Sequence, residues 1–160
     1  LGRLTLDVVH TPGHARGHLC LFEPRTRTLV AGDMVAGVGS IVVDPPEGDM
    51  HDYLASLRRL RALDVGALYP AHGPVLADGN RKLDAFIAHR LQREAQVVGA
   101  MTPGVPTTAL ALVPHVYADV APKLHPLAAR SLTAILDKIA KDGRASRDGD
   151  AYTLFEREPR

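Results

Sequence analysis

The feature of this sequence that most restricts its fold is a repeated arrangement of an apolar run, a glycine and a metal-binding side chain. His14 lies in a glycine-containing loop just after such a run, Asp33 follows Gly32 at the end of a second run, and His72 precedes Gly73 after a third. Apolar runs of this length predict β-strands. Since a sheet positions the loops at its strand ends, we expect the three side chains to meet at one edge.

Three predicted strands precede the first predicted helix in the N-terminal part of the chain, and a fourth strand and a second helix follow. Asp49 or Asp52 can cap the first predicted helix. The predicted strands span residues 3–10, 19–23, 28–33 and 67–70, and the predicted helices span residues 50–64 and 80–99. The second helix has an expected apolar stripe of Leu83, Ile87, Leu91 and Val98. This mixture predicts an α/β fold that includes a β-meander.

The pattern changes at residues 102–106, where two prolines and a glycine predict a linker or sharp turn. Thr107 or Thr108 can cap a short helix that Pro114 kinks or ends early. A second helix is predicted over residues 126–142, and a β-hairpin with an Asp148-Gly149 turn follows it. Helix, helix and hairpin form the skeleton of a winged-helix module. We therefore predict two domains, spanning residues 1–101 and 102–160.

The composition is typical of a soluble globular protein, with 46% hydrophobic and 23% charged residues. A net charge of +1 creates no overall field that attracts nucleic acid or an anionic membrane. No apolar run could span a bilayer and nothing resembles a secretory signal. Cys20 is the single cysteine, so no internal disulfide forms, and we expect a cytoplasmic protein. The chain starts at Leu1, directly before a predicted strand, so we expect a preceding segment to be missing.

The chemistry of His14, Asp33 and His72 fits a metal site. Zinc takes imidazole nitrogen and carboxylate oxygen as ligands, and a carboxylate can bridge two ions roughly 3.5–4 Å apart. A single histidine beside a glycine is more often a solvated or hydrogen-bonded turn residue. Three such side chains, each at a strand end, favour the metal site.

The segments TPGHARGH, AGD and YPAHGP, in this order, resemble the second half of the metallo-β-lactamase superfamily. The stretches GDMHDYLASLRRL and FIAHRLQRE resemble its LACTB2-like branch, whose members end in a winged-helix-like domain. The resemblance covers nearly the whole chain. It implies an α/β (α+β) fold: the C-terminal half of a four-layer αββα sandwich, followed by a small winged-helix-like domain.

The resemblance also implies a role for each residue at a pair of zinc ions. His14 would be a ligand of the first metal, Asp33 would bridge both, and His72 would be a ligand of the second. The family's first motif, H-x-H-x-D-H, is absent from the sequence, and we expect it upstream of Leu1. Each ion would then keep one terminal ligand and a share of Asp33, whereas zinc sites normally have three or four protein ligands. We therefore expect this chain alone to bind metal weakly or not at all, and to be inactive.

Other residues are weaker candidates for the site. His18 could orient a ligand or contact substrate, or be a polar loop residue. Tyr53 could reach a substrate or, as we favour, pack under the loop. His89 could lie at the edge of a pocket or simply on the surface of its helix. Cys20 is expected to be a small buried hydrophobic residue.

The resemblance implies a metal-dependent hydrolase in which a hydroxide attacks an ester, thioester, lactam or phosphodiester. Two alternatives stay open: an endoribonuclease, and a non-catalytic partner-binding protein with a relic metal site. Residues 96–160 contain eight Lys and Arg residues against seven Asp and Glu residues, so the winged module lacks the basic surface typical of nucleic-acid readers. We therefore favour a structural or dimerisation role for that module.

The expected partners follow from the same resemblance. They are a small-molecule substrate or RNA, with no membrane. Half of a two-sheet sandwich also exposes the inner face of its sheet as an apolar patch. We expect the missing N-terminal half, or a second copy in a homodimer, to cover this face.

Overall fold

The computed structural model describes residue 2 and residues 4–118 and 120–156. The chain divides into two compact units, Leu1–Arg90 and Leu91–Arg160, and the division falls inside the long helix α2 (Gly79–Ala100). The domain boundary predicted at residues 101 and 102 lies just beyond that helix and stays a prediction. None of the helices in the described residues has the long apolar segment needed to cross a membrane.

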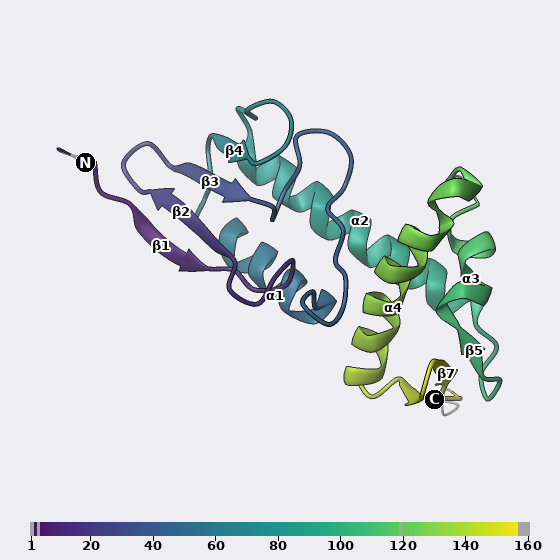
Figure 1. The fold of residues 1–160 in the computed structure, drawn as a ribbon. Coiled ribbons are helices and arrows are strands. Elements are labelled where there is room, and N and C mark those ends of the chain that lie inside the picture. Colours follow the sequence, from purple (N-terminus) through teal and green to yellow (C-terminus); the bar gives the residue numbers. More distant parts are fainter. Residues whose placement is uncertain (1, 3, 119, 157–160) are drawn as a thin grey trace. The chain divides into compact units, whose positions relative to one another are not determined.

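The first unit is built on a four-stranded sheet with the order β1-β2-β3-β4 (Figure 1). Its strands are β1 (Asp7–His10), β2 (Leu19–Glu23), β3 (Thr28–Gly32) and β4 (Leu68–Pro70). The first three are antiparallel neighbours, as the predicted meander requires, and β4 runs parallel to β3.

Strand β1 is shorter than the predicted strand over residues 3–10. Pairing starts at Asp7, which lies opposite Phe22, and β2 ends at the next residue, Glu23. At most Leu6 could extend the pairing, because Leu4 and Thr5 lie beyond the end of β2, and Arg3 lies outside the described residues. The apolar alternation was visible in the sequence, but the length of the partner strand decided where pairing stops.

The two faces of this sheet differ in exposure. Phe22, Leu29 and Leu68 lie opposite one another on neighbouring strands and are almost completely buried. On the other face Val8, Leu21, Val30 and Tyr69 form a second row in register. Val8 is 64% exposed, and Val30 and Tyr69 are 44% and 45% exposed. We call Val8, Leu21, Val30 and Tyr69 the open apolar row.

Helix α1 (Met50–Arg61) covers the buried side of the unit (Figure 1). Asp49 is its N-cap, one of the two predicted residues, and its carboxylate accepts hydrogen bonds from the amides of His51 and Asp52. Three leucines, Leu54, Leu57 and Leu60, are buried on one face of the helix. Ser56 and Arg59 donate hydrogen bonds to carbonyls at the end of β1 and in the following loop, so α1 holds the segment that carries His14.

The apolar stripe predicted for α2 is wrong in part. Leu83 is buried, but Ile87 and Val98 are only half-buried and Leu91 is 41% exposed. The buried positions are Leu83, Phe86, Arg90, Glu94 and Val97. They follow helical spacing too, but two of them are charged. A pattern that counts only apolar residues misses a helix face that buries charged side chains, here Arg90 with a hydrogen bond to a carbonyl and Glu94 with ion pairs.

The second unit has the helix, helix and hairpin order that the sequence predicted. Its elements are β5 (Thr107–Thr108), α3 (Ala109–Val116), a 3₁₀ turn (Pro122–Leu124), α4 (His125–Lys141), β6 (Ala145–Asp148) and β7 (Ala151–Leu154). The sheet order is β5-β7-β6. Thr108 caps α3, which continues past Pro114 to Val116. The hairpin loop is Gly149-Asp150, one residue later than predicted, because Asp148 pairs with Ala151.

Buried charges also organise the second unit. The Glu94 carboxylate contacts Arg144 and lies 2.9 Å from the Lys138 ammonium, which is 2.6 Å from Asp142. Burial alone would lower the pKa of Lys138, but its contacts with Asp142 and Glu94 outweigh this and raise it. The charge that α2 buries here is therefore neutralised within the unit by α4 and the segment that follows it.

The reactivity of Cys20 tests whether the core of the first unit is inaccessible to solvent. Its thiol is fully buried, contacts the Thr11 hydroxyl and the Ala31 carbonyl, and burial raises its pKa from 9.0 to about 11. Thiol reagents attack the thiolate, so at pH 8 we expect labelling to be at least about a hundredfold slower than for an unfolded thiol. The raised pKa also means that stability falls as the pH rises above 9, where the unfolded thiol ionises first.

The measurement is the rate of reaction with a chromogenic disulfide reagent across a urea series. Labelling should follow the unfolding transition seen by circular dichroism. Fast labelling of the native protein, at the rate found in urea, would contradict the buried position.

Candidate metal centre

Three loops bring His14, Asp33 and His72 together. His14 lies in the loop after β1, Asp33 directly follows β3, and His72 lies two residues after β4. One carboxylate oxygen of Asp33, Oδ2, is 3.9 Å from His14 Nε2, and the other, Oδ1, is 3.4 Å from His72 Nε2. The two carboxylate oxygens therefore face two different imidazole rings.

A hydrogen bond on the far side of its ring orients His14. Nδ1 lies 2.9 Å from the carbonyl oxygen of Val42, and because a carbonyl only accepts, the hydrogen belongs to Nδ1. In the neutral ring, Nε2 presents its lone pair toward the Asp33 carboxylate. Two electron-rich atoms facing each other need a cation or a proton between them. An imidazole held by a backbone carbonyl at one nitrogen is the usual state of a metal-binding histidine.

The spacing of these atoms fits metal ligation. Two ligands at 2.0–2.1 Å from a tetrahedral ion lie about 3.3 Å apart. The His72 pair at 3.4 Å matches this value, and the His14 pair at 3.9 Å is about half an ångström wider. The three residues thus fit one carboxylate shared between two ions, each with one imidazole. They supply two ligands per ion, fewer than the three or four of a zinc site.

His18 holds the backbone of Asp33. The Asp33 amide donates to His18 Nε2 at 3.1 Å, so the ring carries its hydrogen on Nδ1, which donates to the Thr11 hydroxyl at 2.8 Å. Burial lowers the pKa of His18 and the nearby His14 adds to this, while Asp33 acts in the opposite direction. A neutral ring is what this arrangement requires, since Nε2 must accept.

The contact with His18 explains the glycine before Asp33. Gly32 has φ +52°, and a Cβ there would lie 2.7 Å from His18 Nε2. Any side chain would push the ring away from the Asp33 amide. The sequence singled out His18 as a residue that could orient a ligand, and the structure brings it against Asp33.

The loop from Met34 to Asp49 begins directly after Asp33 and contacts His14 and the His72 backbone. Its Val42 carbonyl accepts from His14, and its Gly37 amide donates to the His72 carbonyl at 2.8 Å. Arg90 donates to the neighbouring Ile41 carbonyl. This one loop therefore sets the position of both imidazole-bearing segments.

Tyr53 and Arg90 form the support beneath that loop. Tyr53 is fully buried, its hydroxyl donates to the Met34 carbonyl at 2.6 Å, and the Arg90 guanidinium carbon lies 5.2 Å from its ring centre. Burial raises the pKa of Tyr53 although the Arg90 charge opposes this. Tyr53 thus packs under the loop, as favoured, and offers no surface to a substrate. The sequence analysis did not single out Arg90, although this residue lies beside the candidate His89 in the segment FIAHRLQRE.

A second group of metal-binding atoms lies at the start of α1. Asp49, His51 and Asp52 each offer a ligand atom within 4.8 Å of the others. The Asp49 carboxylate already caps the helix through the amides of His51 and Asp52. This cluster is explained by helix capping.

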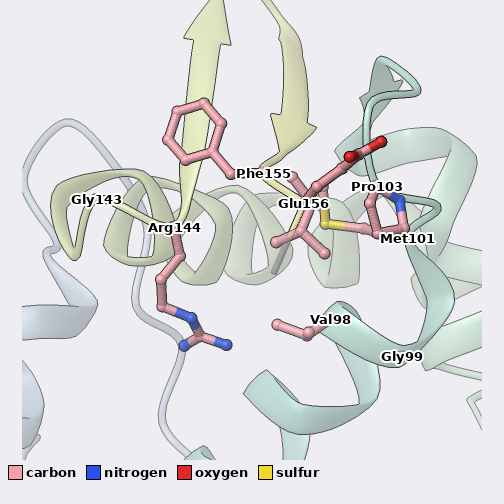
Figure 2. Close-up of a pocket in the computed structure, with 9 residues that line it drawn as sticks. Val98, Gly99, Met101, Pro103, Gly143, Arg144, Phe155 and Glu156 are labelled. Atoms are coloured by element: carbon pink, nitrogen blue, oxygen red, sulfur yellow. The ribbon is translucent and has the colours of Figure 1, made fainter. Parts of the chain in front are cut away.

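A hollow of about 640 Å³ lies in the second unit, at the end of α2. Figure 2 shows Val98, Met101 and Phe155 around it, with Arg144 extending away from Phe155. Arg144 is already paired with Glu94, and the lining residues include no histidine or cysteine. The described lining of this hollow therefore offers no metal ligand of the histidine or cysteine type.

Comparison with known proteins agrees with this arrangement. The model of the metallo-beta-lactamase superfamily matches residues 1–72, which include all three candidate ligands, and that of the beta-lactamase associated winged helix domain matches residues 108–153. A beta-lactamase-like protein 2 homolog from Caenorhabditis elegans is 33% identical over 139 residues, which are 87% of this chain and 46% of that protein.

Two further proteins extend the comparison. An atrochrysone carboxyl ACP thioesterase from Aspergillus fumigatus is 36% identical over 94 residues, covering 59% of this chain and 21% of that protein. The crystal structure of a beta-lactamase domain protein from Burkholderia ambifaria superimposes with a TM-score of 0.81 at 25% identity, covering 96% of this chain and 49% of the other. The chain thus spans about half the length of the relatives that match both of its units. It belongs to the metallo-beta-lactamase superfamily and carries the winged helix domain associated with that family.

Proposed function

We propose that this chain contributes to a two-metal centre that hydrolyses an ester or thioester of a small molecule. The observation that supports it most directly is the Asp33 carboxylate, whose two oxygens face the Nε2 atoms of His14 and His72. Two bound zinc ions would supply Lewis acidity and a water activated near neutral pH. Asp33 would hold both ions, and His14 and His72 would each fix one of them.

The remaining metal ligands are proposed to come from outside these 160 residues. Two ligands per ion are too few for a stable zinc site, and the chain corresponds to about half of its relatives. The open apolar row supports the same proposal, because Val8, Val30 and Tyr69 expose apolar surface across three adjacent strands. We propose that a second sheet, from the rest of the protein or from a second copy, covers this row.

Small-molecule hydrolysis is favoured over cleavage of RNA. One relative is an acyl carrier protein thioesterase by name. In the winged unit, Lys138, Arg144 and Arg147 are each paired with a carboxylate, which leaves these cations poorly suited to binding phosphates. A role in RNA cleavage, and a relic site without activity, are the alternatives to be tested. The cytoplasmic location stays a prediction that depends on the single cysteine.

Metal binding to this chain tests the centre directly. With ¹⁵N-labelled histidines, adding excess Zn²⁺ should shift the Nε2 signals of His14 and His72 together and leave the exposed His115 unchanged. Binding should be weak, with a dissociation constant of about 10 µM or higher, because each ion finds two ligands here.

The matched variant is Asp33→Asn, which keeps the shape of the side chain but removes the charge that both ions share. Both histidine shifts should be lost, whereas Asp148→Asn in the exposed hairpin should change neither. An Asp33→Asn protein that binds zinc like the wild type would contradict the proposed bridge.

His18 should affect metal binding without touching the metal. Replacing His18 by Ala removes the acceptor of the Asp33 amide, so we expect zinc affinity to fall roughly tenfold to a hundredfold. The His115→Ala variant, which alters an exposed histidine of α3, is the control. Calorimetric titration of both variants measures the effect, and equal affinities would show that Asp33 does not need this support.

The reaction itself is tested with the full-length protein that contains this chain. Loaded with zinc, it should hydrolyse acyl thioesters or esters, and Asp33→Asn should lower the rate about a thousandfold or more by removing a ligand of both ions. Single-stranded RNA and a chromogenic lactam are assayed in parallel. Faster cleavage of RNA would favour the ribonuclease, and a metal-loaded protein inactive on every substrate would favour the relic site.

A further inference from the structure

A cavity of about 410 Å³ lies between α2 and the loop that follows Asp33. Its lining residues are Gly39 and Ser40 from the loop and Lys82, Ala85, Phe86 and His89 from α2. All of them belong to the first unit. The volume is within the range of small-molecule sites, and the wall combines an apolar part with a few polar groups.

The cavity borders the candidate metal centre through Gly37. The Gly37 amide donates to the His72 carbonyl at 2.8 Å, and the Gly37 carbonyl accepts from the Lys82 ammonium at 3.0 Å. A Cβ on Gly37 would lie 2.7 Å from Pro74, so the two loops are in close backbone contact at this point. The same loop then continues to Val42, which orients His14. One loop thus contacts the segments that carry His14 and His72 and also lines the cavity through Gly39 and Ser40.

Lys82 gives the cavity a positive charge. Its ammonium is half-buried, lies 5.2 Å from the centre of the Phe86 ring and uses one of its three hydrogens on Gly37. Within the described part of the chain, no carboxylate lies at ion-pair distance from it. The acidic residues nearest to it on the chain are occupied: Asp78 pairs with Arg81, and Asp84 pairs with Arg61.

We propose that this cavity binds an anionic group of the substrate, a carboxylate or a phosphate, through the Lys82 ammonium and the Ser40 hydroxyl. Phe86 and Ala85 would contact the carbon atoms next to that group. This inference rests on the proposed hydrolytic centre and specifies its substrate: the molecule carries an anionic group away from the bond that is cleaved.

The test uses the 160-residue chain, ¹⁵N-labelled and kept in EDTA so that no metal can bind the added anion. Sodium phosphate and sodium acetate are titrated separately against sodium chloride at constant ionic strength. We expect saturable shifts of the Gly39 and Ser40 amides and of the Lys82 ammonium. The anion that binds more tightly identifies the group that the substrate carries. Shifts that are the same in chloride, or that do not saturate with either anion, would overturn the proposal.

Three variants decide whether Lys82 is responsible. Lys82→Met should weaken anion binding about fivefold or more, and Lys82→Arg should retain most of it. The matched control is Arg81→Met, which removes the neighbouring exposed cation that is paired with Asp78. Equal losses of anion affinity in Arg81→Met and Lys82→Met would show that only the net positive charge of the protein matters, and would refute the site. Retention of the wild-type spectrum outside the cavity shows that each variant folds. Because metal is absent, failure here leaves the proposed metal centre untouched, and failure of that centre leaves this result standing.

Discussion

The arrangement of the first unit depends on the hydrogen bond from the Asp33 amide to His18. This bond fixes the backbone at the end of β3, requires a neutral ring with its hydrogen on Nδ1, and leaves no room for a side chain at residue 32. It directs the carboxylate to the place where the loops after β1 and β4 deliver His14 and His72. A small network of neutral hydrogen bonds thus positions the charged group at the centre of the proposed chemistry.

Helix α2 contributes a buried charge to each unit. Arg90 lies against Tyr53 and holds the Ile41 carbonyl in the first unit, while Glu94 binds Lys138 and Arg144 in the second. Charges are buried only at a cost unless they are paired or hydrogen-bonded, and here both have partners. Arg90 therefore links the helix to the loop that orients His14. This connection gives α2 a part in the geometry of the site, in addition to the cavity that Lys82 and His89 line.

Two features of the chain have one explanation in the proposed function. The three candidate ligands fit the geometry of a shared carboxylate but supply only two ligands per ion, and the sheet leaves an apolar row open on the side away from its buried core. A second sheet bearing further ligands would complete the coordination of each ion and would cover the open apolar row. The winged unit has nearly equal numbers of cations and carboxylates, and Lys138 and Arg147 are ion-paired, which is consistent with a structural role for that unit and a small substrate for the centre.

The sequence by itself determined the order of strands and helices in the first unit, the helix, helix and hairpin order of the second, and the candidate set of His14, Asp33 and His72, because periodicity and the residues at strand ends are local properties of the chain. It missed β5, whose two residues are too few to show a pattern. It could not decide the length of β1, which depends on where β2 turns, nor the buried face of α2, where Arg90 and Glu94 replace apolar residues. It also could not decide between a role at the site and a packing or loop role for Tyr53 and His18. Only the tertiary structure decided these, because a polar side chain is buried or exposed according to partners that lie far away in the sequence.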